Sequence, residues 1–169
     1  MTEDIFNRIC KESLENGGAS VGKHICTVSN TLLDYNKCTR LILDIGGQIE
    51  SLRENGLGLL YITSDDISIT SDGSYILTPV ENPLSCDEKG MMLVDRPFIF
   101  NKHTMAPELI HIKQLPSKVF YTSSYYSLKP LALKLLGIDT ITKLYPTKLF
   151  HLIERCSVDD PNGRIFIFV

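Results

Sequence analysis

Residues 123–137 read SSYYSLKPLALKLLG, the strongest structural signal in this chain of 169 residues. The leucines and the alanine occupy much of a helical circumference, a pattern that predicts a buried helix rather than a surface one. Pro130 suits the first turn of such a helix, so its regular part begins near Ser127, and Gly137 is a typical helix end. We expect this helix to lie at the centre of the core.

The clearest helical pattern on the N-terminal side runs from Lys37 to Arg53 and ends at Asn55-Gly56, a typical left-handed terminator. Its apolar stripe consists of Leu41, Ile45, Ile49 and Leu52. Three β-prone segments follow, Leu59 to Ile62, Ile67 to Ile69 and Tyr75 to Thr78. A turn at Ser71-Asp72-Gly73 joins the last two into a predicted hairpin.

The remaining segments are assigned from turn residues and shorter patterns. Residues 79–104 are rich in Pro, Asp, Glu and Lys, which predicts a long surface loop with a short strand at 98–100. A short helix is expected from Met105 to Ile112, and a final helix from Pro146 to Cys156. The apolar run 165–169 is expected to dock on the domain.

The first 36 residues are expected to form an N-terminal helical extension to one compact unit, residues 37–169. Apolar residues from Ile5 to Leu14 recur at helical spacing, and Gly17-Gly18 ends that pattern. A second, weaker helical pattern covers residues 21–32. The predicted fold class is α+β and mainly α-helical.

Composition and charge exclude several kinds of function. The formal net charge of −3 gives no broad basic field, so neither nucleic acid nor an anionic membrane is an expected partner. The five cysteines are scattered and form no C-x-x-C pair, which argues against a disulfide framework or a zinc site and favours a reducing compartment. With an acidic N-terminal segment and no apolar run of about 20 residues, the chain is expected to be soluble and intracellular.

Two further groups of residues could form a functional site, but each also has a purely structural explanation. Residues 17–23 match the first seven positions of a G-x-x-x-x-G-K phosphate loop, but His24 stands where a hydroxyl should follow, and a helix precedes the glycines. We interpret the match as chance and expect no cofactor. Tyr121, Tyr125 and Tyr126 are either core and capping residues or a patch that binds a partner.

Three short motifs occur in a fixed order towards the C-terminal side: Met105-Ala106-Pro107-Glu108, Tyr126-Ser127-Leu128 and Asp160-Pro161-Asn162-Gly163-Arg164. With the helix, hairpin and loop that precede them, they span residues 37–165 in an arrangement that resembles the C-lobe of protein kinases. The resemblance implies a C-lobe-like fold with a small β-hairpin and no N-lobe. The residues before Lys37 are too few for an N-lobe and contain no G-x-G-x-x-G.

The resemblance also implies a structural ion pair. In kinases, the Glu of Ala-Pro-Glu pairs with a late Arg and ties the activation segment to the base of the lobe. The corresponding residues here are Glu108 and Arg164. The alternative is that both are ordinary surface charges.

The residues that carry out phosphoryl transfer in kinases have no matching counterparts. Setting Asp66-Ile67-Ser68-Ile69 on the family's Asn-Ile-Leu-Ile places Tyr61 at the catalytic Asp and Pro79 at the magnesium-binding Asp. Ser124 then stands at the Asp that supports the catalytic loop. A tyrosine ordinarily titrates near 10, and a proline side chain offers no metal ligand. Asp66 could ligate a metal beside Asp65, or both could be solvated turn residues, so no catalytic residue and no metal site is assigned.

These expectations combine into a catalytically inactive, pseudokinase-like protein that acts as a protein-interaction or structural module. It is similar to kinase-like proteins of large DNA viruses, which extends the expectation to a virion component. A protein partner is expected, in a homo- or hetero-oligomer. One alternative is a half-kinase completed in trans by a separate N-lobe, with Asp65 or Asp66 holding the metal. Another is an unrelated α+β binding domain, in which residues 123–136 would not be the central buried helix.

Overall fold

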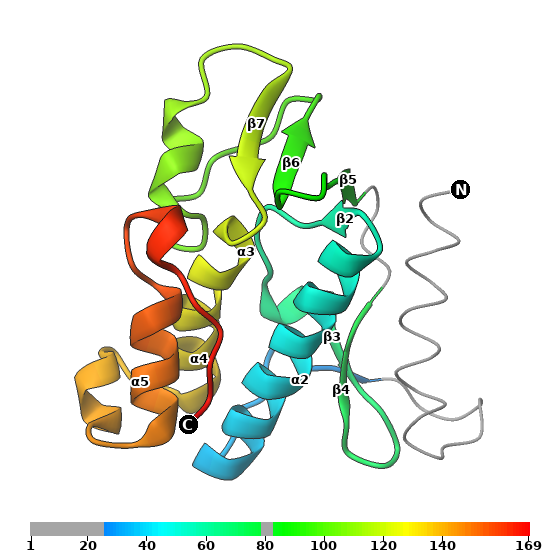
Figure 1. Ribbon diagram of the computed structural model, residues 1–169. Helices are drawn as coiled ribbons and strands as arrows, with labels where there is room; N and C mark the ends of the chain where they lie inside the picture. The colour runs from blue at the N-terminus through cyan, green and yellow to red at the C-terminus, as the bar shows by residue number, and fades with distance from the viewer. Residues whose placement is uncertain (1–25, 79–82) are drawn as a thin grey trace.

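The computed structural model describes residues 26–78 and 83–169, which form an α+β fold of helices and small antiparallel sheets (Figure 1). The α-helices are α2 (Tyr35–Glu54), α3 (Ser123–Tyr126), α4 (Leu128–Leu136) and α5 (Lys148–Cys156). The strands are β1 (Cys26–Thr27), β2 (Leu57–Gly58), β3 (Ile67–Ile69), β4 (Tyr75–Leu77), β5 (Leu84–Ser85), β6 (Met91–Val94) and β7 (Ser117–Phe120). The predicted helix at 5–14, the glycines at 17–23 and Pro79 lie outside the described residues.

Helix α2 confirms the predicted helix at 37–53 and begins two residues earlier. Its N-terminus is set by Asp34, whose side chain accepts a hydrogen bond of 2.9 Å from the backbone N–H of Lys37. The predicted stripe is buried against the rest of the core. Gly56 follows the helix with a φ of 72°, a conformation that glycine adopts at little cost.

The hairpin of β3 and β4 is also confirmed, with Ile67 opposite Leu77 and Ile69 opposite Tyr75. β1 adds a third strand, because Cys26 and Thr27 pair with Ile69 and Ser68. The helix expected over 21–32 is therefore wrong in its described part, where a strand and a turn replace it; β-branched Thr27 suits the strand. Val28 is buried in the main core.

The segment 79–104 contains more structure than a surface loop. β5 pairs with β2, so the strand near residue 59 consists of Leu57–Gly58 rather than 59–62. β6 pairs with β7, with Met91 opposite Phe120 and Val94 opposite Ser117. Residues 98–100 are not a strand. The sequence patterns did not predict these strands, because each strand has only two to four residues and pairs with a strand distant in the chain.

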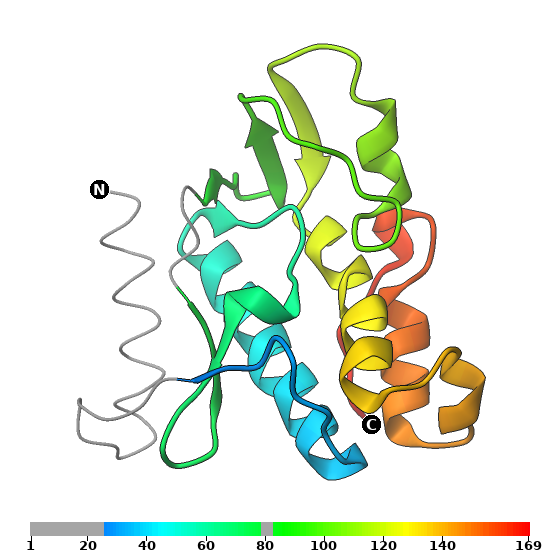
Figure 2. The same cartoon turned by 180° about the vertical axis from the view of Figure 1, so that it is seen from behind.

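Two clusters of buried side chains fill the interior. The larger one lies between α2, α4 and α5, and α4 contributes Leu128, Leu131, Ala132 and Leu135 to it. Leu149, Leu152 and Ile153 of α5 are buried as predicted, and the helix begins after its N-cap, Thr147. The smaller cluster lies beneath β6 and β7 and includes Met92, Val94, Met105, Leu109 and Val119. Figures 1 and 2 show the β6–β7 pair and the chain between them at one end of the molecule, with α5 towards the other.

The C-terminal run docks on the main core through Phe166. Phe166 packs on the main core, with its ring stacked on Tyr125 at 5.5 Å between centroids. Ile165, Ile167 and Val169 are substantially exposed. The prediction of a docked tail is therefore correct for Phe166 and wrong for these three neighbours.

None of the helices in the described part of the chain is both long enough and apolar enough to span a membrane.

Candidate functional site

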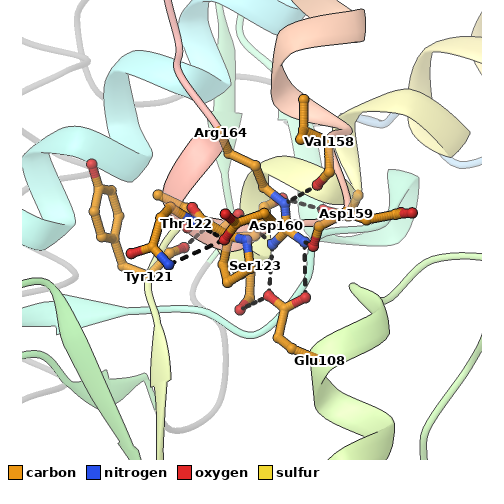
Figure 3. A network of polar contacts seen from close by, with 12 residues as sticks. Glu108, Tyr121, Thr122, Ser123, Val158, Asp159, Asp160 and Arg164 are labelled. Carbon is orange, nitrogen blue, oxygen red and sulfur yellow. Dashed lines mark hydrogen bonds and ion pairs between the residues drawn. The ribbon is translucent and has the colours of Figure 1, made fainter.

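Glu108 and Arg164 form a buried, two-pronged contact (Figure 3). Nη1 of Arg164 lies 2.6 Å from Oε1 of Glu108, and Nη2 lies 2.8 Å from Oε2. The Arg164 side chain is fully buried and that of Glu108 is 19% exposed. The surface-charge alternative is thus wrong, and the structure contains the ion pair that the sequence predicted.

Neighbouring groups fix both partners of this contact. Arg164 also donates to the backbone oxygens of Val158 (2.7 Å) and Asp159 (2.9 Å). Ser123 donates its hydroxyl proton to Oε1 of Glu108 at 2.7 Å. The network therefore joins the 3₁₀ turn Pro107–His111, the start of α3 and the segment after α5, as Figure 3 shows.

Local sequence explains why these segments present the pair. Pro107 stands at the first position of its 3₁₀ turn, where its missing N–H costs no hydrogen bond, and Glu108 follows it. On the other side, the Asp160 carboxylate accepts a hydrogen bond from the backbone N–H of Asn162 and caps the turn Pro161–Gly163. Arg164 comes directly after that turn.

The Glu108 carboxyl is held in its ionised form. Burial by itself would raise its pKa, but the hydrogen bonds from Arg164 and Ser123 outweigh burial and lower the pKa below its ordinary value of 4.5. The arginine thus compensates a carboxylate that would be costly to bury alone.

The loop 59–66, which the resemblance sets against the kinase catalytic loop, is held by two side chains of the α3–α4 region. Ser127 accepts a hydrogen bond of 3.0 Å from the backbone N–H of Ile62 and donates to the carbonyl of Ser124 at 2.6 Å. Lys134 donates to the hydroxyl of Ser64 at 2.7 Å. Ser124 itself donates to the carbonyl of Tyr121. The sequence did not predict that Ser127 would hold this loop, although Ser127 lies within the Tyr-Ser-Leu motif.

Tyr61 and Asp66 both line two hollows on the molecule. The first has a volume of about 210 Å³ and is lined by both residues, by Arg96 and by mostly apolar side chains. The second, of about 380 Å³, shares both residues and adds Asp65 and Thr104. The sequence predicted neither hollow, because their walls come from segments far apart in the chain.

Asp66 has a structural role in its own turn. Its Oδ2 accepts hydrogen bonds from the backbone N–H of Thr63 at 2.7 Å and from the Thr63 hydroxyl at 2.8 Å. These two bonds stabilise the 3₁₀ turn Ser64–Asp66. Within residues 26–78 and 83–169, no group of three or more His, Cys, Asp or Glu side chains is arranged to hold a metal ion.

The tyrosines belong largely to the interior. Tyr121 and Tyr125 both donate to Oε1 of Glu50, and Arg53 lies over the Tyr121 ring at 5.2 Å. Burial, followed by the neighbouring Glu50 charge, raises the pKa of Tyr121 to about 12. Arg164 lies over the ring of Tyr126 at 5.1 Å. These contacts favour the core and capping interpretation over a patch for a partner.

Comparison of the chain with protein-family models gives no match, and a search of the curated proteins finds no similar sequence.

Proposed function

We propose that this protein is a catalytically inactive, protein kinase C-lobe-like module that binds a protein partner or builds a larger assembly. The order of α2, the β3–β4 hairpin, the Ala-Pro-Glu turn and α4 supports a C-lobe-like arrangement. A virion component is the assembly role that the resemblance suggests, in a homo- or hetero-oligomer.

The observation that carries the proposal is the buried contact between Glu108 and Arg164. These residues are 56 positions apart, and both come from the motifs that define the resemblance. A two-pronged arginine–carboxylate contact requires a matched geometry on both sides, so chance motifs would rarely produce it. The hydrogen bonds that hold loop 59–66 to Ser127 and Lys134 are a second, independent observation in favour of a C-lobe-like scaffold.

The chemistry of the site supports the absence of catalysis. Tyr61 supplies a phenol where phosphoryl transfer needs a carboxylate, and Ser124 bonds within its own turn. Asp66, which the half-kinase alternative would use for a metal, has one carboxylate oxygen engaged by Thr63. A protein with the structural contacts of a kinase C-lobe but without its catalytic side chains is suited to binding a partner.

Affinity capture from the native source tests the proposal. The full chain, immobilised through either end, should retain the same partner protein, or further copies of itself, in near-stoichiometric amount. An unrelated acidic protein of similar size on the same support should retain neither. Recovery of no stoichiometric partner in either orientation would contradict the proposal.

A further inference from the structure

A third hollow, the Phe98 groove, lies on the part of the molecule built around β6 and β7. It is lined chiefly by Phe98, Phe100, Ile110, Ile112, Lys113 and Leu115 and has a volume of about 430 Å³. Phe98, Phe100 and Ile112 pack on the smaller core, whereas Ile110 and Leu115 are 61% and 37% exposed. The groove thus combines a fixed apolar base with side chains that remain accessible to a partner.

The two chain segments beside the groove make no backbone–backbone hydrogen bonds with the described residues. In the described residues, no hydrogen bond joins the backbone of 98–100 or of 113–115 to another backbone group. Neither segment is a helix or a strand: residues 98–100 have no regular structure, and residues 114–116 form a bend. Backbone N–H and C=O groups beside an apolar groove are the contacts that an extended peptide uses.

Lys113 is the one charged residue among the described residues that line the groove, and none of them is a carboxylate. The acids nearest to the lining residues in sequence are engaged, since Glu108 contacts Arg164 and Asp95 contacts Arg96 at 3.1 Å. A ligand with an acidic group would therefore meet a complementary charge, although the whole chain carries −3.

We propose that the Phe98 groove binds an extended, acidic segment of a partner protein. Large apolar side chains of that segment would fill the groove, and an Asp or Glu would face Lys113. This inference rests on the proposed role as a protein-interaction module and adds the place and the chemistry of the interaction. The groove shares Pro97 and Phe98 with the first hollow at Tyr61, but it lacks the acids Asp65 and Asp66 that line the hollows there.

A phage-displayed library of random 12-residue peptides, selected on the immobilised full chain, tests the groove. The expected consensus contains spaced Phe, Leu or Ile residues and at least one Asp or Glu. Lys113→Glu should weaken binding of the selected peptides about fivefold or more, and Ile110→Asp should abolish it. Both side chains are exposed, so melting temperatures should stay near the wild-type value.

Lys143→Glu is the charge control, because it makes the same change of sign in the turn Ile141–Leu144, which packs against α5, although it also removes the ion pair of Lys143 with Asp139. Helix α5 lies towards the other end of the molecule (Figure 1). The control variant should leave peptide binding unchanged. The inference is overturned if no sequence is enriched over the bare support, or if the enriched peptides bind Lys113→Glu and Ile110→Asp as tightly as the wild type. The second outcome would show that the peptides bind another surface. It would not contradict the proposed role as a protein-interaction module, which affinity capture of the partner tests separately.

Discussion

Replacing Arg164 with alanine is expected to lower the free energy of unfolding by about 3–5 kcal/mol at neutral pH. The substitution leaves the Glu108 carboxylate largely buried without its partner, and the arginine's bonds to Val158 and Asp159 are lost as well. Chemical denaturation followed by circular dichroism measures the change. Arg155→Ala is the control: this exposed arginine donates one long hydrogen bond of 3.4 Å and should cost under about 0.5 kcal/mol. Equal stability of the two variants would contradict a structural role for the ion pair.

The difference in stability between the wild type and Arg164→Ala should decrease at acidic pH. Because the pKa of Glu108 is lowered in the folded protein, its contribution to stability is complete above the ordinary value of 4.5 and is lost as the pH falls through the folded value. In Arg164→Ala, burial is no longer opposed by the arginine and raises the pKa of the folded Glu108 carboxyl. The difference in stability between the wild type and the variant should therefore shrink as the pH falls through that raised value towards the lowered value of the wild type. A difference that grows on acidification would exclude this carboxylate as the cause.

The second large effect concerns Gly46 and Gly47, which are adjacent in α2 and face different surroundings. A Cβ at Gly46 would overlap the ring of Phe166, whereas nothing lies within 4 Å of a Cβ at Gly47. Gly46→Ala should displace Phe166 from Tyr125 and lower the free energy of unfolding by about 2 kcal/mol, after allowing for the better helix propensity of alanine. Gly47→Ala should raise it by about 0.5–1 kcal/mol.

Thermal and chemical unfolding of the two variants side by side provides the measurement. In a Phe166→Ala background, Gly46→Ala should lose most of its cost, because the side chain that it displaces is absent. If Gly46→Ala stabilises the wild-type protein as much as Gly47→Ala does, Phe166 does not occupy that position.

The parts of the fold that the sequence predicts well are those specified by neighbouring residues. The apolar stripe of α2, the Ser71-Asp72-Gly73 turn and the leucines of α4 each identify an element without reference to the rest of the chain. The Glu108–Arg164 contact is different, since it was predicted through a resemblance between motifs, and composition alone would not have indicated it.

The parts that the sequence misses depend on contacts between distant segments. β6 and β7 are short and lie on either side of a 3₁₀ turn, so neither has a local pattern that specifies its partner. In the sequence, Ser127 resembles an ordinary residue at the start of a helix. Only the folded structure shows that its hydroxyl accepts a hydrogen bond from the backbone N–H of Ile62. The hollows at Tyr61 and the Phe98 groove have the same origin, because each is formed by segments that meet only in the folded chain.

We propose that this chain keeps the scaffold of a kinase-like lobe without its nucleotide chemistry, and a thermal-shift titration with ATP tests that proposal most directly. Wild-type protein and Asp66→Ala should be titrated with ATP in the presence and absence of Mg²⁺. A nucleotide present at about 100 times its Kd would stabilise the folded state by about 2.7 kcal/mol, a shift of several degrees. We expect no saturable shift in any of the four conditions. A rise in melting temperature that requires Mg²⁺ and disappears in Asp66→Ala would contradict the account and favour a half-kinase completed in trans.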